Sequence, residues 1–189
     1  MRRIETRLDG PILIEPTVHG DARGFFVETY RRSLLDEMGI HEDFVQDNHS
    51  RSSRGVVRGI HFQLPPGQAK LVRCSRGAIL DVVVDLRRGS PTFGQWEGHE
   101  LSDDNHRQIY VPVGFGHGFC VLSDVADVVY KVSNYYDAEI ERALAWDDPD
   151  VGIEWPSGLE FSVSERDMQA PSLEQISDEL PFEYQDPPS

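Results

Sequence analysis

The hydrophobic positions of this chain mostly recur in short runs with the period of two that is typical of β-strands. The clearest example lies between residues 78 and 86, where Leu80, Val82, Val84 and Leu86 occupy alternate positions. Successive strand side chains point to opposite faces, so these four residues share one face and the intervening residues share the other.

Similar runs, separated by turns rich in Gly, Pro, Asp and Ser, predict a series of strands along most of the chain. They span residues 12–15, 25–30, 56–62, 70–75, 78–86, 94–101, 108–111, 118–122 and 126–132. Helix signals are few. One helix is predicted over 33–38, with Ser33 as its N-cap and Gly39 after its last residue, and a second near 173–180. Many short strands with little helix predict a β-sandwich or barrel.

Length and turn pattern predict a single domain over residues 1–189, with a flexible C-terminal tail over 182–189. The formal net charge is −15 and the isoelectric point is about 4.7. So acidic a surface repels nucleic acids and anionic membranes, and neither is expected as a partner. A local basic cluster could still bind a small anion, and Arg58, Lys70, Arg73 and Arg76 supply one.

The two cysteines, Cys74 and Cys120, lie inside apolar runs and are too few for a disulfide framework. The first residues include arginines but no apolar stretch behind them, so a secretory signal is not predicted. No segment approaches the roughly 20 apolar residues that a membrane helix needs. We expect a cytoplasmic protein.

The most unusual run is Arg58-Gly59-Ile60-His61-Phe62-Gln63, which places a histidine within a predicted strand. A later motif, Pro112-x-Gly114-x-x-His117, delivers a second histidine after a bend. Metal-binding barrels of the cupin type pair such a turn with a His-x-His strand, but here Gln63 takes the place of the second histidine. Two histidines without a third strong ligand do not predict a metal site.

Inward histidines can instead act as general acids or bases. Removing a proton from carbon requires a neighbouring carbonyl and a cation for the enolate oxygen, a role that suits Lys70. Inverting that carbon requires a proton donor on the opposite face, for which Tyr130 is a candidate. On the residues alone, His61 could equally be a satisfied core histidine, and Tyr130 an aromatic that fills the barrel.

Taken together, the motifs resemble those of the dTDP-4-dehydrorhamnose 3,5-epimerases from about Ile12 to Pro171. They include Asp21-x-Arg23-Gly24-Phe25-Phe26-x-Glu28, Gln46-Asp47-Asn48-His49-Ser50, Arg58-Gly59-Ile60-His61-Phe62-Gln63, Lys70-Leu71-Val72-Arg73, Ser90-Pro91-Thr92-Phe93-Gly94, Pro112-x-Gly114-Phe115-x-His117-Gly118-Phe119, Tyr130-Lys131, Asn134-Tyr135-Tyr136 and Trp146-x-Asp148-Pro149.

The resemblance implies an all-β jelly-roll (cupin-like) barrel with a few short helices, a homodimer, and no metal or other cofactor. By position, His61 matches the catalytic base, Asp167 the carboxylate that orients it, Tyr130 the general acid and Lys70 the residue that stabilises the enolate. The positions that match substrate contacts are Arg23, Glu28, Gln46, Asp47, Asn48, Arg58, Lys70, His117, Tyr136, Glu141 and Arg166. Among them, Tyr136 matches an aromatic that stacks on thymine, and Arg58 suits the pyrophosphate.

Two departures from the family pattern bear on the site. Arg166 stands where lysine is common, which retains the charge. Glu141 is followed by Arg142 where a small residue is common, so we expect this loop to hold the substrate contact less securely.

The implied activity is that of an isomerase without a cofactor. It would convert dTDP-4-dehydro-6-deoxy-α-D-glucose (dTDP-4-keto-6-deoxyglucose) to dTDP-4-dehydro-β-L-rhamnose in dTDP-L-rhamnose biosynthesis. Relatives that invert only C3 or only C5 share the same motifs, so the sequence leaves the number of inverted centres open. A sugar 3,4-ketoisomerase, a metal-dependent cupin oxygenase and a sugar-nucleotide-binding cupin without activity are further alternatives.

Overall fold

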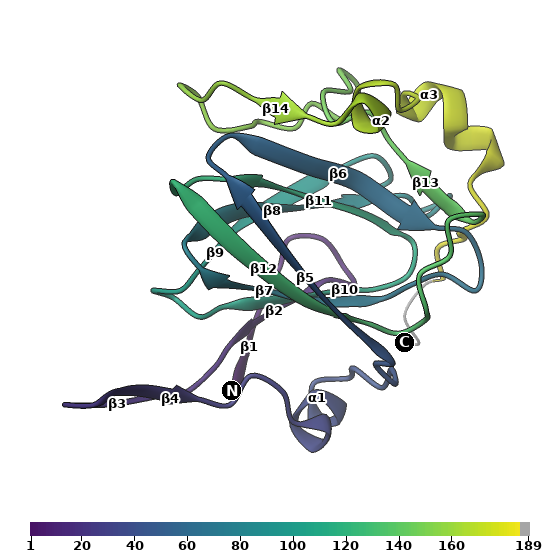
Figure 1. Ribbon diagram of the computed structural model, residues 1–189. Helices are drawn as coiled ribbons and strands as arrows, with labels where there is room; N and C mark the ends of the chain where they lie inside the picture. The colour runs from purple at the N-terminus through teal and green to yellow at the C-terminus, as the bar shows by residue number, and fades with distance from the viewer. Residues whose placement is uncertain (186–189) are drawn as a thin grey trace.

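The computed structural model describes residues 1–185 and consists mainly of two sheets packed face to face (Figure 1). The first sheet has the order β1–β2–β10–β7–β12–β5, formed by Arg2–Ile4, Ile12–Glu15, Gln108–Val111, Lys70–Arg76, Val125–Val132 and Gln46–Ser53. The second has the order β13–β6–β11–β8–β9, formed by Glu141–Ala143, Val56–Gln63, Phe115–Val121, Ala78–Asp85 and Trp96–Ser102. The short strand β14 (Ser162–Val163) pairs with β6 in parallel. Neighbouring strands are mostly distant in sequence, and the jelly-roll prediction is confirmed.

Three apolar clusters hold these layers together. The cluster between the sheets joins Val72 and Val128 of the first sheet to Val83 and Phe119 of the second. The outer face of the first sheet is covered by the segment around α1 (Arg32–Glu37). The outer face of the second sheet is covered by a segment that we call the C-terminal cover, residues 162–182.

The alternation predicted for residues 78–86 is confirmed, but its apolar face is the outer one. Val82, Val84 and Leu86 pack beneath the C-terminal cover, whereas Val83 belongs to the cluster between the sheets. The residues that alternate with them, including Asp81, therefore point into the barrel. Because the cover shields the outer face, the inner face is free to carry polar side chains.

The helices differ from the prediction at their starts. Helix α1 begins at Arg32, its N-cap is Arg31 and no side chain caps it, so the predicted Ser33 cap is wrong. Gly39 follows the helix with a positive φ of 85°, as expected of a C-terminal glycine. The helix predicted near 173–180 is confirmed as α3 (Leu173–Ile176), continued by a 3-10 turn (Ser177–Glu179). Helix α2 (Glu165–Met168) was not predicted.

The strand predicted over 25–30 is shorter, because β4 (Gly24–Val27) pairs with β3 (Val18–Asp21) in a hairpin that ends at residue 27. This hairpin extends away from the body of the molecule (Figure 1). Phe25 and Phe26, near its tip, are 63% and 70% exposed, which is unusual for large apolar side chains.

The predicted flexible tail falls partly outside the described residues. Phe182 is buried in the cluster under the C-terminal cover, and the backbone N–H of Tyr184 donates to the carbonyl oxygen of Arg88 at 2.9 Å. The tail is thus held against the barrel as far as Tyr184, whereas residues 186–189 lie outside the described part. No helix within residues 1–185 is long and apolar enough to cross a membrane.

Candidate active site

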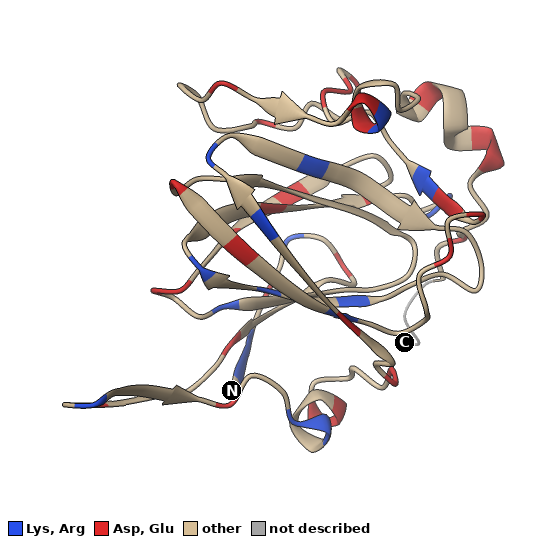
Figure 2. Cartoon of the chain, in the orientation of Figure 1, with Lys and Arg blue, Asp and Glu red and all other residues tan. Residues whose placement is uncertain are grey.

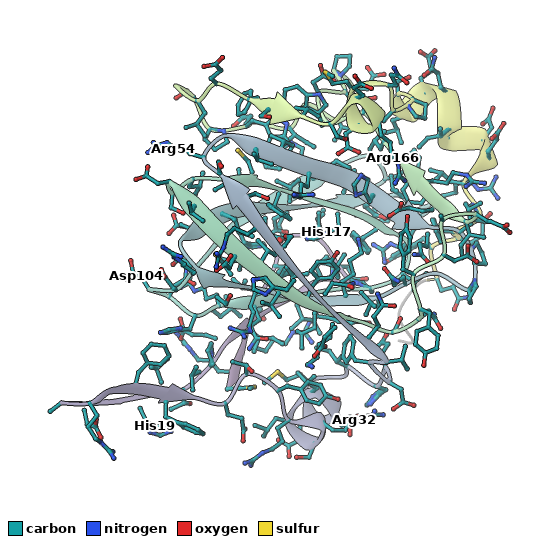
Figure 3. The ribbon with its side chains drawn as sticks, in the orientation of Figure 1. His19, Arg32, Arg54, Asp104, His117 and Arg166 are labelled. Atoms are coloured by element: carbon teal, nitrogen blue, oxygen red, sulfur yellow. The ribbon has the colours of Figure 1, made fainter. Side chains whose placement is uncertain are left out.

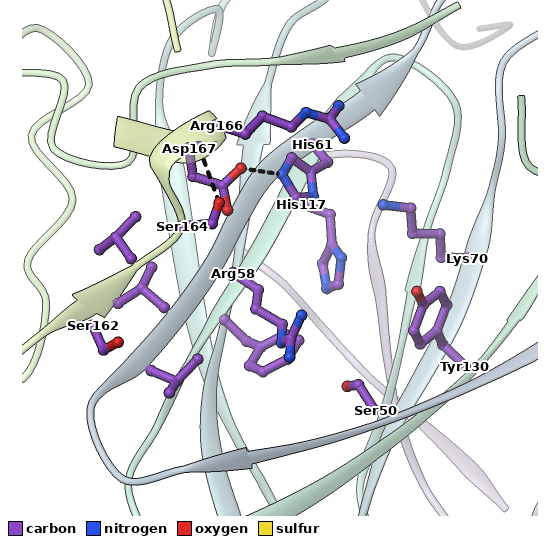
Figure 4. A pocket seen from close by; sticks show the side chains of 14 residues that line it. Ser50, Arg58, His61, Lys70, His117, Tyr130, Ser162, Ser164, Arg166 and Asp167 are labelled. Carbon is purple, nitrogen blue, oxygen red and sulfur yellow. Dashed lines mark hydrogen bonds and ion pairs between the residues drawn. The ribbon is translucent and has the colours of Figure 1, made fainter. Parts of the chain in front are cut away.

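A cavity of about 510 Å³ opens between the two sheets, below α2 and β14 (Figure 4). Seven of the predicted site residues line it: Arg58, His61, Lys70, His117, Tyr130, Arg166 and Asp167. Three of these seven side chains are arginine or lysine and two are histidine, whereas Asp167 is the one acid among them. Acidic residues gather instead on the outside, for example on α3 and the turn after it (Figure 2). The cavity is therefore a local site for an anion on an acidic molecule.

His61 and Asp167 form the first buried pair of the cavity. His61 lies on β6 and Asp167 on α2, and His61 Nε2 lies 2.6 Å from Asp167 Oδ1. Since a carboxylate only accepts, Nε2–H donates and Nδ1 of His61 is left unprotonated. Burial would raise the pKa of the Asp167 carboxyl, but the hydrogen bond and charge of His61 outweigh it and the pKa is lowered. The pair holds a base beside a stable anion.

The local sequence explains how α2 presents this carboxylate. Ser164 is the N-cap of α2, and its Oγ accepts a hydrogen bond from the backbone N–H of Asp167 at 3.1 Å. β14, just before the cap, pairs with β6, so the C-terminal cover is aligned along the strand that carries His61. The side chain of Asp167 is only 5% exposed, so the carboxylate itself is shielded from water.

Lys70 and Tyr130 form the opposite wall, on neighbouring strands β7 and β12 of the first sheet. Neither the Lys70 ammonium nor the Tyr130 hydroxyl has a hydrogen-bond partner among residues 1–185, so both are available to a bound molecule. Burial lowers the pKa of Lys70 to about 8, against the opposing charges of Glu141 and Asp81. Burial also raises the pKa of Tyr130, and the charge of Glu141 adds to this shift. A protonated tyrosine and a readily titrated ammonium thus face His61.

His117 lies on β11 directly opposite His61 of β6 in the strand register. Figure 3 shows it between the two sheets, in the interior of the molecule. Its Nε2 lies 2.9 Å from Asp81 Oδ2, and the two side chains are 8% and 0% exposed. Burial lowers the pKa of His117, although Asp81 opposes this shift. His117 is therefore a neutral imidazole in the wall of the cavity.

Arg58 and one face of β5 form a polar margin of the cavity. Arg58 Nε donates to Ser52 Oγ at 3.0 Å, which leaves the rest of the guanidinium without a hydrogen-bond partner among the described residues. Ser50, on the same face of β5, also lines the cavity. Further along that face, Gln46 donates to Asn48 at 2.8 Å. This margin places the guanidinium of Arg58 beside further hydrogen-bonding side chains, a combination that suits phosphate oxygens.

Tyr136, Glu141 and Arg166 form a network at the cavity rim. The Tyr136 hydroxyl donates to Glu141 Oε2 at 2.9 Å, and Arg166 pairs with the same oxygen at 2.6 Å. The backbone N–H of Tyr136 donates to Gln46 Oε1 at 3.1 Å, which joins the rim to β5. Glu141 is thus held on both sides by contacts within the chain. Whether the loop holds the substrate less securely because of Arg142 stays a prediction.

Three predicted substrate contacts do not reach this cavity. Asp47 faces the other side of β5, where it pairs with Lys131 at 2.8 Å. Arg23 pairs with Asp21 at 2.5 Å on the projecting hairpin, and Glu28 pairs with Arg31 at 2.7 Å just beyond it. Within one chain, neither Arg23 nor Glu28 lines the cavity that contains His61.

In the described part of the chain, no group of three or more His, Cys, Asp or Glu residues is arranged to hold a metal ion. Gln63, at the position of the missing histidine, is 5% exposed and buried in the sheet. The donor set around His61 and His117 consists of two separate histidine–carboxylate pairs, a pattern suited to proton transfer.

Sequence reasoning missed Ser164 and the role of Asp81. Ser164 could have been found, because Ser-x-x-Asp before a short helix is an N-cap pattern. Asp81 carried a weaker signal, a charged residue within an apolar strand. Its contact with His117 depends on how β8 and β11 pair, which the sequence does not encode locally.

Comparison with known proteins gives a consistent result. The family model described as dTDP-4-dehydrorhamnose 3,5-epimerase matches residues 5–175. A protein of that description from Pseudomonas aeruginosa is 52% identical over 167 residues, which cover 87% of this chain and 92% of the relative.

Two solved structures show the range of related activities. The dTDP-6-deoxy-D-glucose-3,5-epimerase of Legionella pneumophila, solved with dTDP-4-keto-L-rhamnose, has a TM-score of 0.94 and 46% identity, covering 98% of this chain and 99% of that one. A 3'-monoepimerase from Streptomyces bikiniensis, solved with dTDP-quinovose, has a TM-score of 0.86 and 41% identity, covering 92% of this chain and 88% of that one.

Proposed function

The chain belongs to the dTDP-4-dehydrorhamnose 3,5-epimerase family, and on that premise we propose that it inverts both C3 and C5 of dTDP-4-keto-6-deoxyglucose. As a member it is an isomerase. The observation that supports epimerisation is the cavity in which the His61–Asp167 pair faces Lys70 and Tyr130 from the opposite sheet. The proposal of two inverted centres rests on the similarity to 3,5-epimerases.

In this reaction, the C4 ketone acidifies the hydrogens on C3 and C5. Nδ1 of His61 takes one of these protons, and the C–H electron pair forms an enolate whose oxygen is stabilised by the Lys70 ammonium. Tyr130 then donates its phenolic proton to the same carbon from the other face, which inverts the centre. His61 loses its proton to water and Tyr130 regains one, so the cycle can be repeated at the second carbon.

Binding of the nucleotide arm positions the sugar for these steps. We assign the pyrophosphate to Arg58 and the polar face of β5, including Gln46 and Asn48, since a guanidinium binds phosphate oxygens in pairs. The thymine ring is assigned to Tyr136, which is 50% exposed and anchored through its hydroxyl to Glu141. Such anchoring converts binding free energy into orientation at the reacting carbons.

We further propose that the protein acts as a homodimer, because Arg23 and Glu28 can contact substrate only in a second copy's cavity. The exposed Phe25 and Phe26 of the hairpin would be covered in the same contact. Mixing and refolding two inactive variants, Arg23→Ala and His61→Ala, should then restore activity at about a quarter of the sites, since mixed dimers carry one intact cavity each. An inactive mixture would contradict this assignment. The cytoplasmic location stays a prediction from the sequence.

The deciding experiment is the reaction in D₂O with dTDP-4-keto-6-deoxyglucose, followed by mass spectrometry and proton NMR of the product. Two incorporated deuterons with the rhamno configuration are expected. One deuteron at C3 alone would instead support a monoepimerase, which the similarity to the Streptomyces bikiniensis enzyme makes the second candidate. Tight dTDP binding without any exchange would contradict catalysis altogether.

A further inference from the structure

Asp81 is a buried carboxylate that takes no direct part in the reaction described above. It lies on β8, is 0% exposed, and does not line the cavity. Its Oδ2 contacts His117 Nε2 at 2.9 Å, whereas its Oδ1 is buried without a hydrogen-bond partner among the described residues. A buried carboxylate oxygen without a donor is costly, so its presence calls for a functional explanation.

The contact determines which nitrogen of His117 carries the proton. A carboxylate has only acceptor atoms, so Nε2 must be the protonated nitrogen. Nδ1 of a neutral His117 is then an acceptor, and no residue within 1–185 donates to it. Since His117 lines the cavity, the free acceptor is available to whatever occupies it.

The acceptor character of His117 separates its role from that of Lys70. The ketone or enolate oxygen at C4 needs a donor, and Lys70 on the facing sheet supplies one. An acceptor-only imidazole cannot bind that oxygen, but it can take a hydrogen bond from a sugar hydroxyl. With the opposite tautomer, His117 would donate into the cavity and compete with Lys70 for the C4 oxygen.

We propose that Asp81 is a positioning residue, which fixes His117 in the Nε2–H tautomer so that Nδ1 accepts a hydrogen bond from a hydroxyl of the bound sugar. The inference rests on the proposed epimerase function for the identity of the ligand. The tautomer itself can be measured on the free protein, independently of any substrate.

The first test is nitrogen-15 NMR of the protein labelled at histidine, with the His117 signals assigned by their loss in His117→Asn. In the unsubstituted protein, His117 should be neutral with its proton on Nε2. In Asp81→Asn the side-chain amide can donate or accept, so a mixture of tautomers is expected. A proton on Nδ1 in the unsubstituted protein would overturn the proposal.

The second test is a double-mutant cycle on epimerisation. Asp81→Asn should lower kcat/KM by about 10- to 100-fold, the size expected for one hydrogen bond to a charged group. In the His117→Asn background, measured well below the pKa of Lys70 so that the Asp81 charge does not change the protonation of Lys70, the same substitution should change kcat/KM by less than about twofold. An equal loss in both backgrounds would show that Asp81 does not act through His117.

Asp85 provides a matched control on the same strand. It is also 0% exposed, but it binds Arg87, Ser90 and Thr92 in the following turn. Asp85→Asn should lower the melting temperature without changing the His117 tautomer. If the unsubstituted protein shows the Nε2–H tautomer but no epimerisation, the proposed function fails while the tautomer stands, so the two failures can be told apart.

Discussion

His61 on β6 and His117 on β11 face each other, and each is paired with a buried aspartate. We call His61–Asp167 the first pair and His117–Asp81 the second pair; they differ in their exposure to solvent. In both pairs Nε2 contacts an aspartate and Nδ1 is left free. The side chain of His61 is 26% exposed, whereas that of His117 is 8% exposed and its pKa is lowered by burial. Burial disfavours the cationic form of an imidazole, and His117 is the more deeply buried of the two. Exposure therefore separates a base that takes a proton from an acceptor that only holds a hydroxyl.

The largest expected effect is on the first pair. His61→Ala removes the base, and epimerisation should fall by about 10²- to 10⁴-fold, the usual contribution of general acid–base catalysis. Deuterium incorporation at C3 and C5 should be lost with it, as measured by NMR in D₂O. If full exchange persisted, His117 or another group would be the base, and the contrast between the two pairs would be wrong.

Tyr130→Phe should separate proton removal from inversion. The product rate should fall by about 10²-fold or more because the donor on the opposite face is missing. His61 can still remove a proton and return a deuteron to the same face, so exchange without inversion should continue in recovered substrate. Loss of both exchange and inversion would assign Tyr130 a role in proton removal.

Asp167→Asn keeps the shape of the first pair and removes its charge. We expect kcat to fall by about 10- to 100-fold, because the imidazolium formed during proton removal loses a charge-assisted hydrogen bond. Single-turnover kinetics should show the loss in the chemical step, with dTDP affinity unchanged. A loss confined to KM would mean that Asp167 holds substrate and does not support the base.

The pH dependence of kcat/KM tests the role of Lys70, which lies in the cavity wall opposite His61. Lys70 has a pKa of about 8, so its ammonium is present below that pH and is lost as the pH rises through it. Because the charged form stabilises the enolate, kcat/KM should decrease about tenfold per pH unit above the pKa. In Lys70→Arg, which stays charged, this decrease should disappear from the profile whatever the residual rate. An unchanged profile would assign the decrease to another group.

The smallest effect is expected at the rim, where neither pair is touched. Tyr136→Ala should raise KM by about tenfold through lost stacking, since one base–aromatic stack contributes about 1–3 kcal/mol. Tyr136→Phe keeps the ring and loses only the hydrogen bond to Glu141, so it serves as the control. A large change in kcat in Tyr136→Ala would show that the rim affects the chemistry itself.

Periodicity and turn residues were enough to predict the β architecture, because alternation and Gly or Pro breaks act locally. The predicted cap at Ser33 failed because helix α1 starts one residue earlier, where packing of Leu35 and Ile40 against the first sheet decides its position. Alternation in β8 also did not reveal which face is inner, since that depends on the distant C-terminal cover.

The site residues likewise divide into those that sequence motifs predicted and those whose contacts depend on the folded sheet. The family motifs placed Arg58, His61, Lys70, His117 and Tyr130 in the site, and one cavity contains all five. The contact between Asp81 and His117 joins two strands whose pairing only the folded sheet defines. The placement of Arg23 and Glu28 outside the cavity follows from the direction of a hairpin, which no local pattern encodes.

The position of the C-terminal cover at the end of the chain affects when the active site is completed during translation and how proteolysis would inactivate it. Asp167 follows His61 by 106 residues, after every strand of both sheets, with β14 just before it. A ribosome that has released the chain only to β13 can therefore expose a barrel with a histidine but no carboxylate behind it. A protease that cuts between β13 and β14 would likewise break the covalent link between the strand that carries His61 and the helix that carries Asp167. Intact catalysis thus reports that the last quarter of the chain has been made and remains attached.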